Sequence, residues 1–132
     1  MAITFDKMLG VHQYTLGVRT QNAELIASNI ANADTPGYKS QGMNFQQALA
    51  QARRGTDSYS LDRTDQRHFA VELKPSGTEM YRVPTQPDTG DGNTVDLQLE
   101  QNLYMQNALE YQMTMTFLDA RIAGVKKALT GQ

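Results

Sequence analysis

The sequence predicts a mainly α-helical chain. Long N- and C-terminal helices are expected to pair as an antiparallel, coiled-coil-like arm pair, with a middle made of a short helix, loops and a possible β-hairpin. Apolar residues recur at helical spacing near both ends, whereas all four prolines lie between positions 36 and 87 and charged residues are concentrated in residues 51–93. The predicted parts are 1–35 (N-terminal helix and turn), 36–93 (middle segment) and 94–132 (C-terminal helix).

Composition bounds the possible functions. The 132 residues are enough for one domain. An apolar content of 39% argues against a large hydrophobic core within the single chain. The net charge of −2 gives no basic surface for nucleic acid, and the absence of cysteine excludes disulfides and thiolate chemistry. No apolar stretch reaches the roughly 20 residues that would insert in a membrane. The N-terminus also lacks the pattern of an ordinary signal peptide.

The N-terminal helix is predicted over residues 4–33, with fraying before Val11. Two apolar lines of sevenfold spacing form a broad stripe, and two glycines weaken the helix by roughly 1 kcal/mol each. Pro36 disfavours helix at the residue before it, and Pro36-Gly37 fits positions i+1 and i+2 of a type II turn. The helix should therefore stop near Ala33. The first line is Leu9, Leu16, Ala23 and Ile30, the second is Val11, Val18 and Leu25, and the glycines are Gly10 and Gly17.

The middle segment is predicted to open with a short helix within residues 39–53, capped by Asn44. Residues 68–74 alternate between apolar and polar side chains, which is typical of a strand. Residues 75–77 (Pro-Ser-Gly) have turn chemistry, so residues 80–83 could return as the partner strand. An isolated hairpin is marginal in water, and this one would need a surface to pack on.

The C-terminal helix is predicted to start at Asn93 or Thr94, with Asp96 completing a capping-box-like pair. It carries the clearest pattern in the chain, an apolar series with alternating steps of four and three, as in a coiled coil. We call this series the C-terminal seam: Tyr104, Ala108, Tyr111, Met115, Leu118, Ile122, Val125 and Leu129.

A single amphipathic helix is not stable alone in water, so each arm needs a partner. Pairing residues 9–30 with 104–129 would still leave Leu103, Leu109 and Phe117 uncovered, and large exposed apolar patches usually mark association surfaces. We therefore expect the arms to pack against other subunits, although an ordinary small helical-bundle core explains the pattern equally well. For Asn29, an interhelical hydrogen bond that fixes register and a solvent-facing place near the helix end are both open.

No motif indicates catalytic, cofactor-binding or metal-binding residues. The triplet Asp88-Thr89-Gly90 occurs in aspartic proteases but lacks apolar flanks here, so a turn is the better interpretation. His12 and His68 have no cysteine partner and no zinc-site spacing. We expect no enzyme, no cofactor and no small-molecule substrate. The alternative kept open is a discrete monomeric helical binding module or small enzyme.

The segment Ser-Asn-Ile-Ala-Asn-Ala-Asp-Thr-Pro-Gly-Tyr, residues 28–38, resembles the N-terminal signature of the bacterial flagellar axial proteins, the rod and hook subunits. Three further segments are similar to the short proximal rod members of that family. The resemblance thus covers both arms and parts of the middle. The segments are residues 63–69, residues 91–97, and Tyr111-Gln112 with Phe117-Leu118.

The resemblance implies a structural subunit that packs with itself and other flagellar rod proteins into a hollow tube. Neighbours would include an adaptor of the FliE type and the membrane-ring and export-gate proteins. The chain would leave the cytoplasm unprocessed through the flagellar type III apparatus and reach the basal body in the periplasmic space. Phe45 and Leu49 are similar to the apolar pair by which such subunits engage the export gate, though the buried face of a short helix would look the same.

The expected subunit-packing residues are the C-terminal seam together with Leu9, Leu16, Ala23, Ile26, Asn29 and Ile30. The family-signature turn comprises Asn32, Asp34, Thr35, Pro36, Gly37 and Tyr38.

Overall fold

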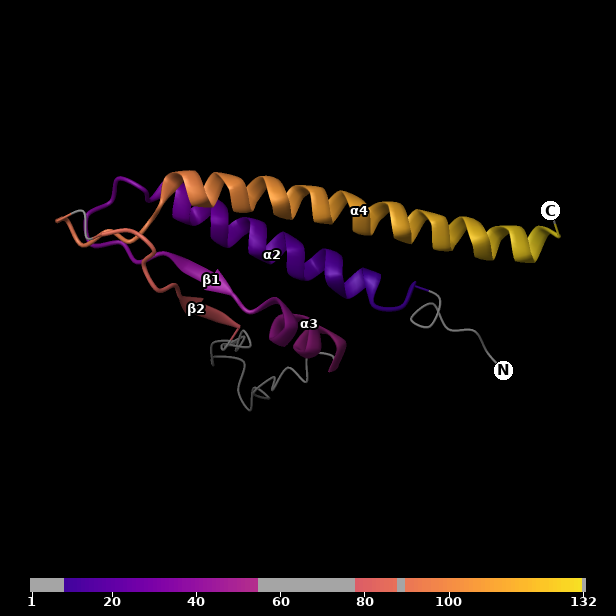
Figure 1. The fold of residues 1–132 in the computed structure, drawn as a ribbon. Helices are drawn as coiled ribbons and strands as arrows, with labels where there is room; N and C mark the ends of the chain where they lie inside the picture. Colours follow the sequence, from indigo (N-terminus) through magenta and orange to yellow (C-terminus); the bar gives the residue numbers. More distant parts are fainter. Residues whose placement is uncertain (1–8, 55–77, 88–89, 132) are drawn as a thin grey trace, which may run out of the picture.

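The computed structural model describes residues 9–54, 78–87 and 90–131. Within them lie the helices α2 (His12–Ala31), α3 (Phe45–Arg54) and α4 (Leu97–Thr130), and the strands β1 (Gln41–Met43) and β2 (Glu79–Tyr81) (Figure 1). The mainly helical fold with two long terminal helices is confirmed.

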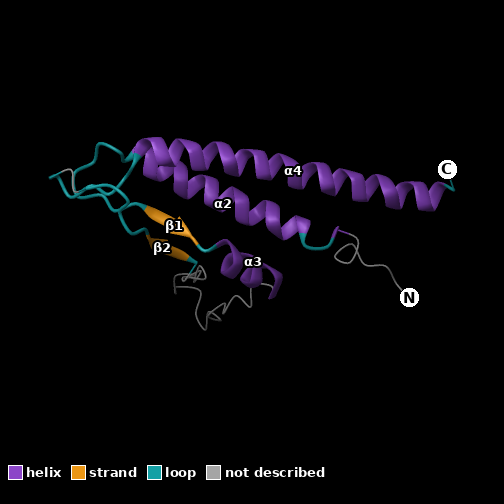
Figure 2. Cartoon of the chain, in the orientation of Figure 1, coloured by secondary structure: helices purple, strands orange, loops and turns teal. Residues whose placement is uncertain are grey.

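The helices α2 and α4 lie side by side and run in opposite directions, as Figure 2 shows. Three pairs define their register: the rings of His12 and Phe117, whose centroids are 6.1 Å apart, an ion pair between Arg19 and Glu110, and a 3.2 Å hydrogen bond from Asn22 to Asn107. From one pair to the next, the residue number rises along α2 by the same amount as it falls along α4. The predicted antiparallel arm pair is therefore confirmed.

The N-terminal helix differs from its prediction at one point. Gly10 has a φ of +60°, and α2 starts only at His12, with no side-chain cap at Val11. A left-handed residue cannot continue a right-handed helix, so the predicted helix is interrupted at Gly10, within the part before Val11 where fraying was expected. Residues 4–8 of that prediction lie outside the described residues. The helix ends at Ala31 with Asn32 as C-cap, close to the predicted Ala33.

The short helix α3 begins as predicted. The side-chain oxygen of Asn44 accepts a 3.2 Å hydrogen bond from the amide of Gln47, and its carbonyl oxygen accepts one from Ala48. Asn44 thus satisfies amides that would otherwise lack a partner in the first turn.

The strand predicted at residues 80–83 is found at Glu79–Tyr81, but its antiparallel partner is β1, with Gly42 opposite Met80. The predicted partner, residues 68–74, lies outside the described residues. Residues 41–43 were not predicted as a strand, because three residues are too few to show an alternating pattern.

The start of α4 corrects a prediction. Asp96, and not Asn93 or Thr94, is the N-cap, and its carboxylate accepts hydrogen bonds from the amides of Gln98 and Leu99. Asn93 lies before the helix and has a different role, described below.

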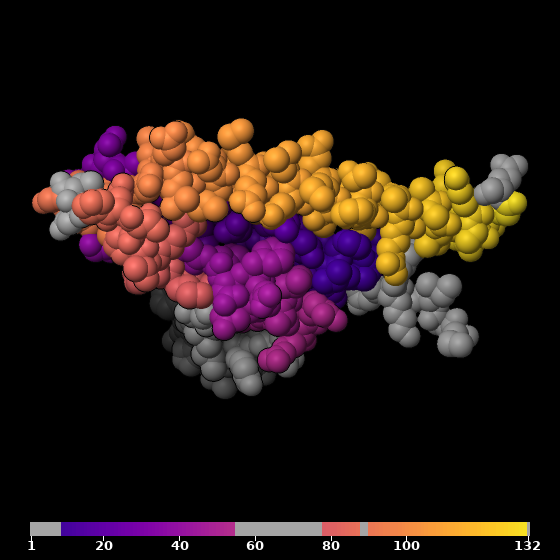
Figure 3. All heavy atoms as spheres, viewed as in Figure 1, coloured from indigo at the N-terminus to yellow at the C-terminus, as the bar shows by residue number. Residues whose placement is uncertain are grey.

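The described residues bury little apolar surface: Val18, Ile26, Ala48 and Val95 are the buried apolar residues among them. Polar residues are buried beside these, namely Asn29, Ser40, Asn93, Glu100, Asn107 and Thr114. The space-filling view shows α4 as a long ridge whose C-terminal part extends beyond the middle segment (Figure 3). Within the described residues, no helix is both long and apolar enough for a membrane span.

Candidate subunit-packing surface

The signature turn and the segment before α4 form one hydrogen-bonded junction. The side-chain amide nitrogen of Asn93 donates to the carbonyl oxygens of Asn32 at 3.0 Å, Ala33 at 2.7 Å and Thr35 at 2.9 Å. The carbonyl groups at the end of a helix have no partner within the helix. Asn93 therefore helps to end α2 from a position some sixty residues further along the chain, at a sequence separation of 61 from Asn32.

Backbone hydrogen bonds extend this junction. The amide of Gly37 donates to Asp91, and that of Thr94 donates to Tyr38. The amide of Tyr38 also donates to the carbonyl of Thr35, which closes the predicted turn, and Gly37 has the required positive φ of +75°. The signature turn is thus held within the chain by the segment before α4.

The side chain of Asn29 neither forms an interhelical hydrogen bond nor faces solvent, the two roles considered for it. It is fully buried, its amide nitrogen donates to the carbonyl of Gln41 at 2.7 Å, and its oxygen accepts from the amide of Gln41 at 3.0 Å and from the hydroxyl of Tyr38. Asn29 therefore fixes the start of β1 against α2. The interhelical hydrogen bond belongs instead to Asn22 and Asn107.

The centre of the contact between α2 and α4 is polar. Glu100, Asn107 and Thr114 are buried at intervals of seven, and Asn107 also donates to the carbonyl of Arg19 at 3.0 Å. Sequence reasoning missed this polar line because it followed the apolar series. The sevenfold spacing of the three residues was the signal that could have found it.

The C-terminal seam lies beside this polar line and remains largely uncovered within one chain. Tyr104 is 46% exposed, Met115 38%, Ile122 42% and Leu129 82%. Ala108 and Tyr111 are also exposed, whereas Leu118 and Val125 are half-buried. Most of the seam is therefore available to a neighbouring molecule.

Part of α2 lies next to the seam. A cavity of about 230 Å³ is lined by Ala23 from α2 and by Tyr104, Ala108 and Tyr111 from α4, which brings one predicted α2 residue together with three seam residues. Leu9, Leu16 and Ile30 are half-buried. Ile26 and Asn29 are buried inside the chain, so these two expected packing residues contribute to the fold of the subunit itself.

Phe45 and Leu49 lie on α3 and are half-buried, next to the buried Ala48. The guanidinium of Arg19 sits 4.6 Å from the centroid of the Phe45 ring, which is a cation–π distance. In the folded chain Phe45 thus forms part of the contact between α3 and α2.

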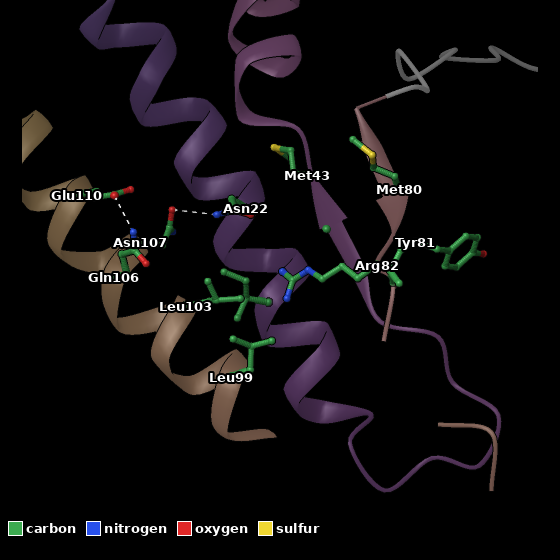
Figure 4. Close-up of a pocket in the computed structure, with 13 residues that line it drawn as sticks. Asn22, Met43, Met80, Tyr81, Arg82, Leu99, Leu103, Gln106, Asn107 and Glu110 are labelled. Atoms are coloured by element: carbon green, nitrogen blue, oxygen red, sulfur yellow. Dashed lines mark hydrogen bonds between the residues drawn. The ribbon is translucent and has the colours of Figure 1, made fainter. Parts of the chain in front are cut away.

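A second, larger groove lies on the other side of α4. It has a volume of about 550 Å³ and separates the β1–β2 ribbon from α4, with Leu99 and Leu103 on the helix side and Met43 and Met80 on the strand side (Figure 4). Its polar side chains include Arg82 and Glu110.

The described residues hold no group of three or more histidine, cysteine, aspartate or glutamate side chains that could bind a metal ion. His68, Asp88 and Thr89, which the sequence analysis considered, lie outside the described residues.

Comparison with known sequences gives consistent matches. A family described as "Flagella basal body rod protein" matches residues 12–39, which run from the start of α2 through the signature turn. A protein of Aeromonas hydrophila named "Flagellar basal body rod protein FlgB" is 50% identical over 100% of this chain and 99% of its own length. Proteins with the same name from Escherichia coli and Salmonella typhimurium are 39% and 36% identical, over 94% and 96% of this chain and 94% and 95% of their own lengths.

Proposed function

Since the chain belongs to the FlgB family of flagellar basal body rod proteins and is a structural subunit of that rod, we propose that the C-terminal seam and the adjoining face of α2 are the surface by which it packs against neighbouring rod subunits. The comparisons do not support the alternative of a monomeric binding module or small enzyme, and we propose no catalytic role, no cofactor and no small-molecule substrate.

One observation carries this proposal: the seam is apolar and regularly spaced, yet it remains exposed after α2 and α4 have paired. Fully burying one large aliphatic or aromatic side chain contributes roughly 1.5–3 kcal/mol. Tyr104, Met115, Ile122 and Leu129 together therefore offer several kcal/mol to an assembly that covers them. Methionine adapts its shape to irregular neighbours, which suits contacts with more than one kind of subunit.

The direct test places a charge on the seam. Ile122→Asp and Leu118→Asp should abolish rod assembly and motility, because each would bury an unpaired carboxylate between subunits. Gln112→Asp is the matched control, since it adds the same charge to α4 at an exposed polar position. Assembled rods and normal motility with Ile122→Asp would contradict the proposal, provided that circular dichroism shows an unchanged helix content.

We propose further that the assembled partners are other copies of this chain, the other flagellar rod proteins, a FliE-type adaptor, and the membrane-ring and export-gate proteins, in a hollow tube at the proximal end of the rod in the periplasmic space. Family membership supports this proposal. A photo-crosslinking amino acid at Met115 should capture these proteins, identified by mass spectrometry, and one at Gln112 should capture fewer. Capture of none of them at Met115 would contradict it.

Export through the flagellar type III apparatus is proposed on the same grounds, with Phe45 and Leu49 as the recognised pair. Since both are half-buried in the folded chain, recognition has to occur before α3 packs on α2. Phe45→Ala should lower the exported amount, and Gln46→Ala, an exposed neighbour on α3, should not. Equal export of the two variants would contradict this role.

A further inference from the structure

We propose that the groove between the β1–β2 ribbon and α4 receives the C-terminal end of α4, residues 118–130, from a second copy of this chain. The contact would be head-to-tail and would use the C-terminal half of the seam, with the groove as its partner surface. This inference rests on the proposed function, because it assumes that copies of the chain assemble.

The groove has a fixed wall. Arg82 donates to the carboxylate of Glu100 at 2.7 Å, and Glu100 is almost completely buried. A methyl group at Gly42 would lie 2.7 Å from Nε of Arg82, so only glycine leaves room for this arrangement. Figure 4 shows Arg82 reaching from the strand toward the helices, with Leu99 and Leu103 facing the same space. The strand side of the groove is therefore tied to α4 by an ion pair.

The groove has the size and chemistry to bind aliphatic side chains. Its volume of about 550 Å³ lies within the range of roughly 300–1,000 Å³ that is usual for binding pockets. Leu99, Leu103, Met43 and Met80 supply apolar surface, and Met80 is 47% exposed. The carboxylate of Glu110 lies at one border, and Glu79 precedes Met80 on the strand.

The other half of the contact is the end of α4. The pairing of His12 with Phe117 means that α4 after Phe117 runs past the start of α2 (Figure 1). This end continues the apolar series with Ile122 and Leu129, both exposed. Exposed Lys126 and Lys127 accompany them. Glu110 is paired with Arg19 and Arg82 with Glu100, so the exposed Glu79 beside Met80 is the carboxylate left to meet the basic neighbours of the apolar end of α4.

The two surfaces differ, and this decides what they build. A contact between two copies of one patch closes as a dimer, whereas a contact between two different patches continues into a ring or an open helical array. A subunit of an extended rod needs a contact between two different patches. The groove and the end of α4 lie on different parts of the molecule, and the apolar groove with Glu79 beside it suits an apolar helix end that carries Lys126 and Lys127, so they meet this requirement.

Cysteine crosslinking tests the contact without background, because the chain contains no cysteine. Single variants Met80→Cys and Leu129→Cys are purified, concentrated, and treated with a short bismaleimide separately and as a mixture. We expect a dimer mainly in the mixture, with roughly fivefold more product than in either variant alone, and products larger than a dimer when one chain carries both substitutions. Equal dimer in each single variant, or crosslinking of the double variant only within one chain, would overturn the proposal.

A charge reversal tests the same contact independently. Lys126→Glu with Lys127→Glu should lower the Met80–Leu129 crosslink roughly fivefold, as expected for loss of about 1 kcal/mol of ion pairing. Adding Glu79→Lys should restore it, and the control Arg54→Glu should have no effect. Crosslinks between Ala23→Cys and Tyr111→Cys on different copies report on the N-terminal half of the seam, which the groove contact does not use. If those form and the groove crosslink does not, this inference fails and the proposed function stands.

Discussion

The side-chain amide nitrogen of Asn93 lies 2.7 Å from the carbonyl oxygen of Ala33, just beyond the end of α2. The same nitrogen reaches the carbonyls of Asn32 and Thr35, and the Asn93 oxygen accepts from the amide of Val95 at 2.8 Å. One buried side chain thus joins the end of the first long helix to the segment that leads into the second.

Asn93→Asp should destabilise the chain by about 3 kcal/mol, because it replaces a donor with a carboxylate oxygen facing three carbonyl oxygens in a buried site. Urea unfolding followed by circular dichroism measures this loss. Asn102→Asp makes the same chemical change at an exposed position of α4 and should change the free energy of unfolding by less than about 0.5 kcal/mol. Equal effects of the two substitutions would mean that the Asn93 hydrogen bonds contribute little.

Gly42→Ala should destabilise the chain by about 1–3 kcal/mol, because the new methyl group displaces Arg82 and leaves the carboxylate of Glu100 buried without its partner. Gly17→Ala is the matched control. It adds the same methyl group in α2, where nothing lies within 4 Å, and should stabilise by about 0.5–1 kcal/mol. Chemical denaturation of both variants measures whether each substitution raises or lowers the free energy of unfolding. Stabilisation by Gly42→Ala would show that Arg82 can move away at no cost.

Sequence patterns predicted what depends on local chemistry. The end of α2, the turn at Pro36-Gly37, the Asn44 cap and the long C-terminal helix all follow from residues within four positions of one another. The exposed apolar series on α4 was also visible, because helical periodicity is a local property. These features account for the helices and for most of the candidate packing surface.

What could not be predicted depends on contacts between distant parts of the chain. Asn93 was interpreted as a helix cap. The three carbonyl oxygens to which it donates lie about sixty positions earlier in the chain, at a separation of 58 from Thr35, so no local pattern reveals them. Asn29 was considered for an interhelical bond, but its partner is the backbone of β1, a strand of three residues with no pattern of its own. Polar side chains that pair with backbone atoms leave no periodic trace in the sequence.

Asn107→Leu should destabilise the chain by about 1–2 kcal/mol, because it leaves the amide of Asn22 without its partner in the helix interface. The double variant Asn22→Leu with Asn107→Leu should recover most of the loss, since apolar groups of similar shape replace both partners. A double-mutant cycle in urea separates this coupling from the effect of either substitution alone. Additive losses would show that the two asparagines act independently.

Hydrogen exchange should report a gradient along the arm pair in the free chain. Amides near the junction, in residues 26–31 of α2 and 97–107 of α4, should exchange slowest, because buried Ile26, Asn29 and Glu100 protect that end. Amides in residues 118–130 should exchange fastest and should become protected when the chain is assembled in isolated basal bodies. Mass spectrometry of peptides from the free and assembled states measures both. Uniform slow exchange along α4 in the free chain would mean that the exposed seam needs no neighbour to hold the helix, and would remove the energetic reason for assembly through it.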